Sequence, residues 1–143
     1  MISFKRRERK SSEETGLITI ESHRSVKDTI DRICGIVESR GLKVFARIDH
    51  AKNAEGVGLQ LRPTELVIFG DPKVGTLVIQ DKQSAGIDLP VKMLAWEDAS
   101  GKVWLTYNSA EWIAERHGLS PQSDATIKAI ADAMSRLSNV ATM

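Results

Sequence analysis

The sequence of 143 residues predicts an α+β fold, a two-layer antiparallel sheet with helices on one face. Two long segments with apolar residues at helical spacing stand near the two ends of the chain. Between them, segments of strand length follow one another with only short helices inserted. Strands in series, with the long helices outside the series, are typical of α+β proteins. Charged residues at alternate strand positions fit a sheet covered on one face only: Lys43, Arg47 and Lys92.

Residues 15–22, TGLITIES, are rich in β-branched residues and predict the first strand. Ser25 is a favourable N-cap for the first helix, because its hydroxyl can accept a hydrogen bond from the first turn. This helix is predicted over 26–40, and Gly41 is predicted to stop it. Its apolar residues recur at spacings of four, three and four: Val26, Ile30, Ile33 and Val37.

Residues 42–48 predict the second strand, because every other residue is apolar and these residues would share one face: Leu42, Val44, Ala46 and Ile48. The following segment, 50–58, is rich in Ala and Gly and predicts a short helix or a loop. Pro63 holds Arg62 in an extended conformation. Residues 65–70, ELVIFG, are an apolar run of strand length.

Asp71 and Pro72 predict the start of a short helix that ends near Gly86, since an N-cap residue is followed by proline at the first helical position. Two further strands are predicted over 90–96 and 102–107, and the residues between them, Asp98-Ala99-Ser100-Gly101, predict a hairpin turn.

Two helices are predicted after the last strand. Asn108, with Glu111 three residues later, predicts a capped helix that ends at Gly118. Ser120 and Pro121 predict the start of the final helix. Its apolar residues recur at three, four and three: Ile127, Ile130, Met134 and Leu137.

Composition limits the classes of partner. The net charge is +1, with 41% hydrophobic and 27% charged residues, so no overall field attracts nucleic acid and no nucleic-acid partner is expected. No run approaches the roughly 18 apolar residues of a membrane span, and no membrane partner is expected. The charged start lacks the apolar stretch of a signal peptide. The single cysteine, Cys34, excludes an internal disulfide. These features predict a cytoplasmic protein.

Residues 1–14 predict a disordered basic tail, because lysines and arginines are followed by Ser and Glu without an apolar stretch. A nucleic-acid or membrane-surface arm is the alternative, although no aromatic residues are interleaved with the basic ones. Residues 15–143 are predicted to form a single domain.

A series of short motifs resembles a known family. They are Ile48-Asp49-His50, Leu61-Arg62-Pro63-Thr64, Phe69-Gly70-Asp71-Pro72, Gly75-Thr76, Leu89-Pro90 and the hairpin 96–103. In this order and spacing they resemble the domain-of-unknown-function 302 family of small bacterial and archaeal proteins. The resemblance covers residues 18–108. It implies a β-α-β4-α order like that of the TATA-box-binding protein, and a homodimer.

The resemblance implies no catalytic residues, because no activity is established for the family as a whole. Two positions depart from its pattern. This chain has Asp71 where the family often has asparagine, and Val91 where many members have a cysteine. A redox or metal role that depends on that cysteine is therefore not expected here.

The residue patterns of common chemistries are missing, and neither a metal nor a cofactor is predicted. The three histidines, His23, His50 and His117, have no ligand spacing, and Cys34 has no CxxC partner. Cys34 is interpreted as a buried structural thiol. Neither a GxSxG nucleophile motif nor a phosphate-binding GxxxxGK[ST] motif occurs.

Two groups of residues remain as candidate ligand-binding residues. The first is polar and flanks strand ends and turns: His50, Arg62, Thr64 and Asp71. It predicts a small polar pocket over the sheet or at a dimer seam. The alternative is structural, with Arg62 paired to a carboxylate, Thr64 starting a strand and Asp71 capping a helix.

The second group is the aromatic pair Trp96 and Trp104, on facing strands of one hairpin. With Met93, this pair can line an apolar groove. Packing in the core or at a dimer interface is the alternative.

The leading functional hypothesis is a non-enzymatic, homodimeric, cytoplasmic domain that binds a small, mostly apolar ligand or a protein partner. The first alternative is a small enzyme in which His50 works with Asp71 or Asp88 as an acid–base pair. The second is a protein-interaction module that acts through the dimer and the basic tail.

Overall fold

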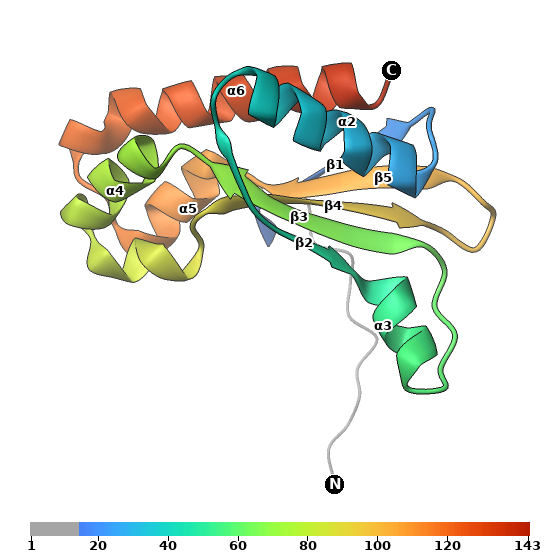
Figure 1. Cartoon of the computed structure of the whole chain (residues 1–143). Coiled ribbons are helices and arrows are strands. Elements are labelled where there is room, and N and C mark those ends of the chain that lie inside the picture. Colours follow the sequence, from blue (N-terminus) through green and yellow to red (C-terminus); the bar gives the residue numbers. More distant parts are fainter. Residues whose placement is uncertain (1–14) are drawn as a thin grey trace, which may run out of the picture.

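The computed structural model describes residues 15–143 and confirms the predicted α+β fold (Figure 1). The predicted tail, 1–14, lies outside the described residues. One antiparallel sheet has the strand order β1–β5–β4–β3–β2. The strands are β1 (Leu17–Ser22), β2 (Lys43–Asp49), β3 (Thr64–Gly70), β4 (Val91–Glu97) and β5 (Val103–Asn108). A strand, a long helix, four strands and a second long helix follow one another, which is compatible with the expected TATA-box-binding-protein-like order.

Two long helices, α2 (Val26–Ser39) and α6 (Asp124–Ala141), lie on the same face of the sheet (Figure 1). Their predicted apolar stripes point inward: Ile30 and Ile33 are fully buried, and Met134 is only 4% exposed. Each fully buried side chain of this size contributes about 1.5–3 kcal/mol. The buried sheet residues of the main core are Val67, Phe69, Met93, Ala95, Val103, Leu105 and Tyr107.

The ends of α2 follow the predicted signals. The Ser25 hydroxyl accepts a hydrogen bond from the backbone N–H of Asp28 at 3.0 Å. Gly41 has φ +71°, a left-handed conformation that glycine adopts without strain. The helix therefore stops at the predicted place.

The predicted cap of the next-to-last helix, α5 (Ala110–His117), is wrong by one residue. Asn108 is the last residue of β5, where it pairs with Leu17 of β1. Ser109 is the N-cap instead, since its hydroxyl accepts a hydrogen bond from the backbone N–H of Trp112 at 3.2 Å. Strand pairing thus overrides the local capping signal at Asn108.

Three short helical segments join the strands. They are α3 (His50–Gly56), α4 (Pro72–Asp81) and a 3₁₀ turn (Gln83–Ile87). The α4 helix starts at Pro72 as predicted, but its predicted end at Gly86 is wrong. Lys82 adopts an extended conformation, φ −137° and ψ 111°, and ends α4 there. A second 3₁₀ turn (Pro121–Ser123) precedes α6. No helix within residues 15–143 has both the length and the apolar character needed to cross a membrane.

A β-bulge in β2 overturns the prediction that residues 42–48 present a single apolar face. Val44 pairs with Phe69 and Ala46 pairs with Ile68, so Phe45 is an extra residue on its strand. One extra residue reverses the alternation of side chains between the two faces of a sheet. Val44 consequently packs against the main core, whereas Ala46 lies on the opposite face.

The reversal also turns Arg47 toward the helices. Its guanidinium Nη1 lies 2.7 Å from Asp31 Oδ1 of α2, and its Nε donates to Glu65 of β3. This arginine therefore links the edge of the sheet to α2 through two carboxylates.

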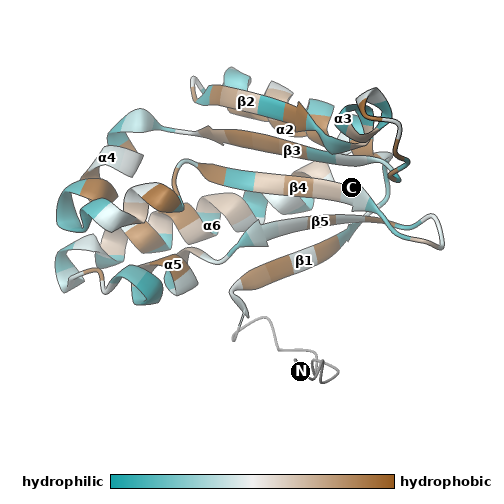
Figure 2. Ribbon diagram, turned by 90° about the horizontal axis from the view of Figure 1, so that it is seen from below, coloured by the Kyte–Doolittle hydropathy of each residue, from teal (hydrophilic) through white to brown (hydrophobic). Residues whose placement is uncertain are grey.

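The other face of the sheet is not covered by α2 or α6, and Figure 2 shows the strands in front of these helices. Its side chains alternate with the buried ones. The apolar residues on it are Leu17, Ala46, Ile48, Leu66, Ile68, Leu94, Trp96 and Trp104. We call this surface the open sheet face.

Candidate functional site

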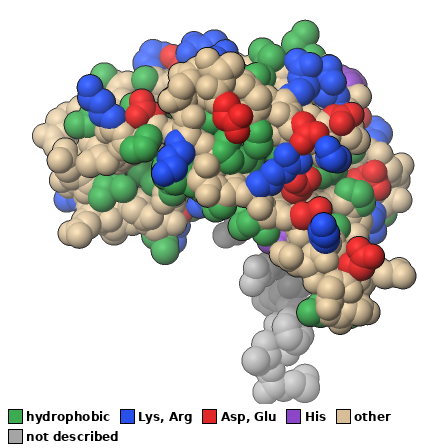
Figure 3. Space-filling model, viewed as in Figure 1, with side chains coloured by type: hydrophobic (Ala, Val, Ile, Leu, Met, Phe, Trp, Pro, Cys, Tyr) green, Lys and Arg blue, Asp and Glu red, His purple; other side chains and the backbone are tan. Residues whose placement is uncertain are grey.

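A largely apolar pocket of about 430 Å³ lies within the helix layer, where α2 ends. Its walls come from the end of α2, the bulge in β2, the start of α4 and the middle of α6. The segment that enters β4 closes it on a further side. In Figure 3, which has the same view as Figure 1, hydrophobic side chains lie near the middle of the surface. We call this cavity the helix-layer pocket.

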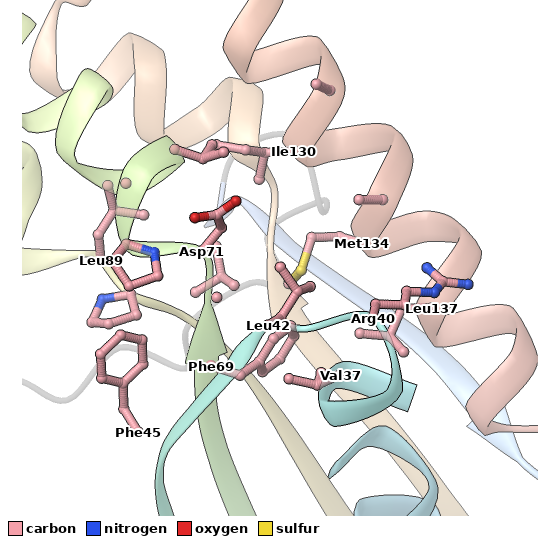
Figure 4. Close-up of a pocket in the computed structure, with 18 of the residues that line it drawn as sticks. Val37, Arg40, Leu42, Phe45, Phe69, Asp71, Leu89, Ile130, Met134 and Leu137 are labelled. Carbon is pink, nitrogen blue, oxygen red and sulfur yellow. The ribbon is translucent and has the colours of Figure 1, made fainter. Parts of the chain in front are cut away.

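Apolar side chains from distant parts of the chain line this pocket. Figure 4 shows Leu42, Leu89, Ile130 and Met134 around it. Phe45, the bulged residue, is 40% exposed and also contributes to the lining. The bulge in β2 therefore places an aromatic ring at the pocket.

Three polar side chains, Arg40, Asp71 and Thr76, belong to the lining. Thr76 donates its hydroxyl hydrogen to the Pro72 carbonyl at 2.6 Å, within α4. Asp71 caps α4, since its Oδ1 accepts a hydrogen bond from the backbone N–H of Lys73 at 2.9 Å. Two of the three polar groups are thus already engaged by α4.

Asp71 is the one predicted ligand-binding residue that lines the helix-layer pocket. It follows β3, whereas Thr64 begins that strand, so the strand separates them. At about 3.3 Å per residue, the seven residues of β3 (Thr64–Gly70) span roughly 20 Å. The predicted polar group of His50, Arg62, Thr64 and Asp71 is therefore not brought together.

Arg62 and Thr64 make local contacts at the far end of β3. The Thr64 hydroxyl donates to the Arg62 carbonyl at 2.8 Å. The Arg62 Nε donates to the backbone carbonyl of Glu97 at 3.2 Å, so its partner is a carbonyl and not the carboxylate of the structural alternative. Thr64 pairs in register with Trp96. These residues border the open sheet face.

Trp96 and Trp104 form the expected cross-strand pair on that face, with ring centroids 6.4 Å apart. The Trp96 indole donates to the Thr106 hydroxyl, and the Trp104 indole donates to Asp98, each at 2.9 Å. The hydrogen bond from the Trp104 indole lowers the pKa of Asp98 to about 2, and the bond from the Ser100 hydroxyl is the next largest cause. Both rings are thus held by polar contacts.

Met93 does not join the tryptophans in a groove. It is fully buried on the helix side of β4, because its side chain points away from that of Trp96 three residues later. The predicted groove of Met93, Trp96 and Trp104 is therefore absent.

The acid–base pair of the enzyme hypothesis is not assembled either. His50 follows β2 at the end where Asp49 pairs with Glu65, whereas Asp71 follows the opposite end of β3. Asp88 binds another histidine: its Oδ2 lies 2.6 Å from His117 Nε2.

This Asp88–His117 contact is part of a cluster that sequence reasoning missed. His117 Nδ1 also lies 2.9 Å from the Ser84 hydroxyl, and Arg116 donates to Asp88 Oδ1 at 3.0 Å. The His117 side chain is only 7% exposed. No sequence signal links these residues, because about thirty positions separate Ser84 and Asp88 from His117. The cluster holds the segment before β4 against α5.

Neither cysteine chemistry nor metal binding finds support within residues 15–143. Burial raises the pKa of the Cys34 thiol, which favours the less reactive protonated form. Within residues 15–143, no group of three or more His, Cys, Asp or Glu residues is arranged to hold a metal ion.

The chain is similar to two kinds of known protein: proteins named as fluoride-specific ion channels, and an uncharacterised protein of known structure. The chain is 52% identical over 117 residues to a protein of Brucella suis named fluoride-specific ion channel FluC 1. The match covers 82% of this chain and 46% of the relative. The fluoride-specific ion channel FluC 2 of Brucella melitensis is also 52% identical, and the match covers 43% of it. The chain thus spans less than half the length of these relatives.

A crystal structure shares the fold. It is that of an uncharacterised conserved DUF302 protein from Bacillus stearothermophilus, with a TM-score of 0.67 and 16% identity. The match covers 89% of this chain and 95% of the other. The model of the domain of unknown function DUF302 matches residues 18–137. The chain belongs to the DUF302 family.

Proposed function

We propose that this protein is a non-enzymatic, cytoplasmic, homodimeric domain that binds a small, mostly apolar ligand in the helix-layer pocket. The pocket itself is the observation that supports this most. Its volume of about 430 Å³ lies within the usual range of ligand sites, roughly 300–1,000 Å³. Such sites combine an apolar lining with a few polar groups that orient the ligand, as here.

The elements around the pocket favour a preformed site. The α2 end is fixed by Gly41, the α4 start by the Asp71 cap, and Met134 is held in the core. A pocket held open by packed elements requires little ordering when a ligand enters, so less binding energy is lost.

Filling part of the pocket should weaken binding. Gly75 lines it, and a Cβ built on Gly75 would meet nothing within 4 Å. Gly75→Leu should therefore fold, occupy part of the cavity and weaken binding at least about tenfold, about 1.4 kcal/mol. The measurement is a fluorescence titration with the uncharged probe N-phenyl-1-naphthylamine.

Gly35→Leu is the matched control, because Gly35 also lies in a helix, has nothing within 4 Å of its added Cβ and does not line the pocket. It should bind the probe like the parent. A parent protein that ignores the probe, or a Gly75→Leu variant that binds it fully, would contradict the proposed function.

The homodimer in this proposal uses the open sheet face. Beyond the sheet, the loop after α3 exposes three further apolar residues: Val57, Leu59 and Leu61 are 74%, 66% and 50% exposed. Figure 1 shows α3 extending beyond the sheet. Stable interfaces bury about 800 Å² on each partner. A five-stranded face together with this loop offers an apolar surface suited to a second copy.

Leu94→Lys should convert the dimer to monomer, because Leu94 stands on the central strand of the open sheet face, beside Leu66. Sedimentation velocity at micromolar concentration measures the change. Leu77→Lys is the control, since Leu77 is a 51% exposed residue of α4 outside that face. A parent that is already monomeric, or a Leu94→Lys variant that stays dimeric, would remove this interface.

A second function is suggested by the relatives: we propose that the domain acts as a ligand-responsive accessory to a fluoride-specific ion channel. The identity of 52% supports a shared role for the matched region, which makes up 46% of the Brucella suis protein. The remaining part of that protein is then available for the channel itself.

Fluoride efflux from liposomes tests this second function. The Brucella suis relative is compared with a version that lacks the matched region. The shortened protein should still conduct, and N-phenyl-1-naphthylamine should change efflux at least about twofold only in the full-length protein. A full-length protein that is insensitive to a bound probe would refute the accessory role.

A further inference from the structure

One of the residues that line the helix-layer pocket is an arginine, Arg40, whose guanidinium has no partner among the described residues. Within residues 15–143, five arginines donate to a carboxylate or a backbone carbonyl: Arg24, Arg32, Arg47, Arg62 and Arg116. No described acceptor binds the side chain of Arg40 or of Arg136. Arg40 alone of this pair lines the pocket.

The helix end explains why the Arg40 guanidinium is free. Arg40 is the C-cap of α2, a position where an arginine often binds the last carbonyls. Here backbone N–H groups already occupy these carbonyls. Arg40 N–H donates to Ile36, Gly41 N–H to Glu38 and Leu42 N–H to Val37, at 3.0–3.1 Å. The negative end of the helix dipole favours a cation here without fixing its side chain.

Asp71, the carboxylate that lines the same pocket, does not pair with the Arg40 guanidinium. Asp71 accepts a hydrogen bond from the first turn of α4, whose positive end stabilises its charge. In Figure 4 the Asp71 carboxylate points toward Ile130, whereas the Arg40 guanidinium lies away from it. The pocket therefore has an apolar interior, an engaged anion on one side and an unengaged cation on another.

We propose that the ligand is an amphiphile with a carboxylate head, whose apolar chain fills the pocket and whose head binds Arg40. This inference rests on the proposed function of the same pocket. Guanidinium groups bind carboxylates through two parallel hydrogen bonds, which fixes the orientation of the head as well as its charge. The apolar lining accepts the chain without any further polar contact.

Competition against N-phenyl-1-naphthylamine tests the head group. Decanoate, 1-decanol and decylamine carry the same chain with an anionic, a neutral and a cationic head. Decanoate should displace the probe from the parent at about tenfold lower concentration than 1-decanol. Arg40 is exposed, so water weakens the ion pair and a larger factor is not expected.

Variants of Arg40 test whether the preference for decanoate over 1-decanol depends on this residue. Arg40→Gln should make decanoate and 1-decanol equal, and Arg40→Lys should restore part of the preference. Arg136→Gln is the matched control, because Arg136 has no described partner and does not line the pocket. It should behave as the parent does.

Two results overturn the carboxylate assignment while the proposed function stands. In the first, 1-decanol or decylamine displaces the probe as well as decanoate does. In the second, the preference for decanoate survives Arg40→Gln. If the parent binds neither the probe nor any of the three amphiphiles, the proposed function fails and the carboxylate assignment falls with it.

Discussion

The packing of α2 against one face of the sheet is the constraint on which the rest of the structure depends. Ile30 and Ile33 hold this helix in place, and its 14 residues cover about 21 Å. The α6 helix beside it has 18 residues and reaches about 27 Å. Since Gly41 stops α2 early, α6 continues past it and α4 covers the next part of the layer. The helix-layer pocket is the space left between these three helices.

Local signals predicted the parts of this arrangement that depend on neighbours in sequence. The Ser25 and Asp71 caps and the apolar stripes of α2 and α6 were correct, because a few adjacent residues determine each of them. The bulge at Phe45 was not predictable, since the period-two pattern of β2 continues through it and only pairing with β3 reveals the extra residue. The same limit hid the pocket. Its lining comes from segments far apart in the chain, and only Asp71 among the candidate residues belongs to it.

The two faces of the sheet differ in what they present. The helix side encloses a pocket of ligand size, while the open sheet face presents an apolar surface that includes Trp96 and Trp104. Because both faces share the same strands, a second copy on one side and a ligand on the other would act on a common sheet. Coupling between the two sites would require this sheet to have two arrangements, each favoured by one of the two occupants.

Methionine methyl NMR tests ligand binding in the pocket most directly. The chain has four methionines, so selective ¹³C labelling gives few signals. Met134 lines the helix-layer pocket, whereas Met143 is 72% exposed elsewhere. Saturating N-phenyl-1-naphthylamine should shift the Met134 methyl signal strongly, through the ring current of the bound probe, and leave the Met143 signal in place. An unchanged Met134 signal, under conditions where fluorescence reports bound probe, would contradict binding in this pocket.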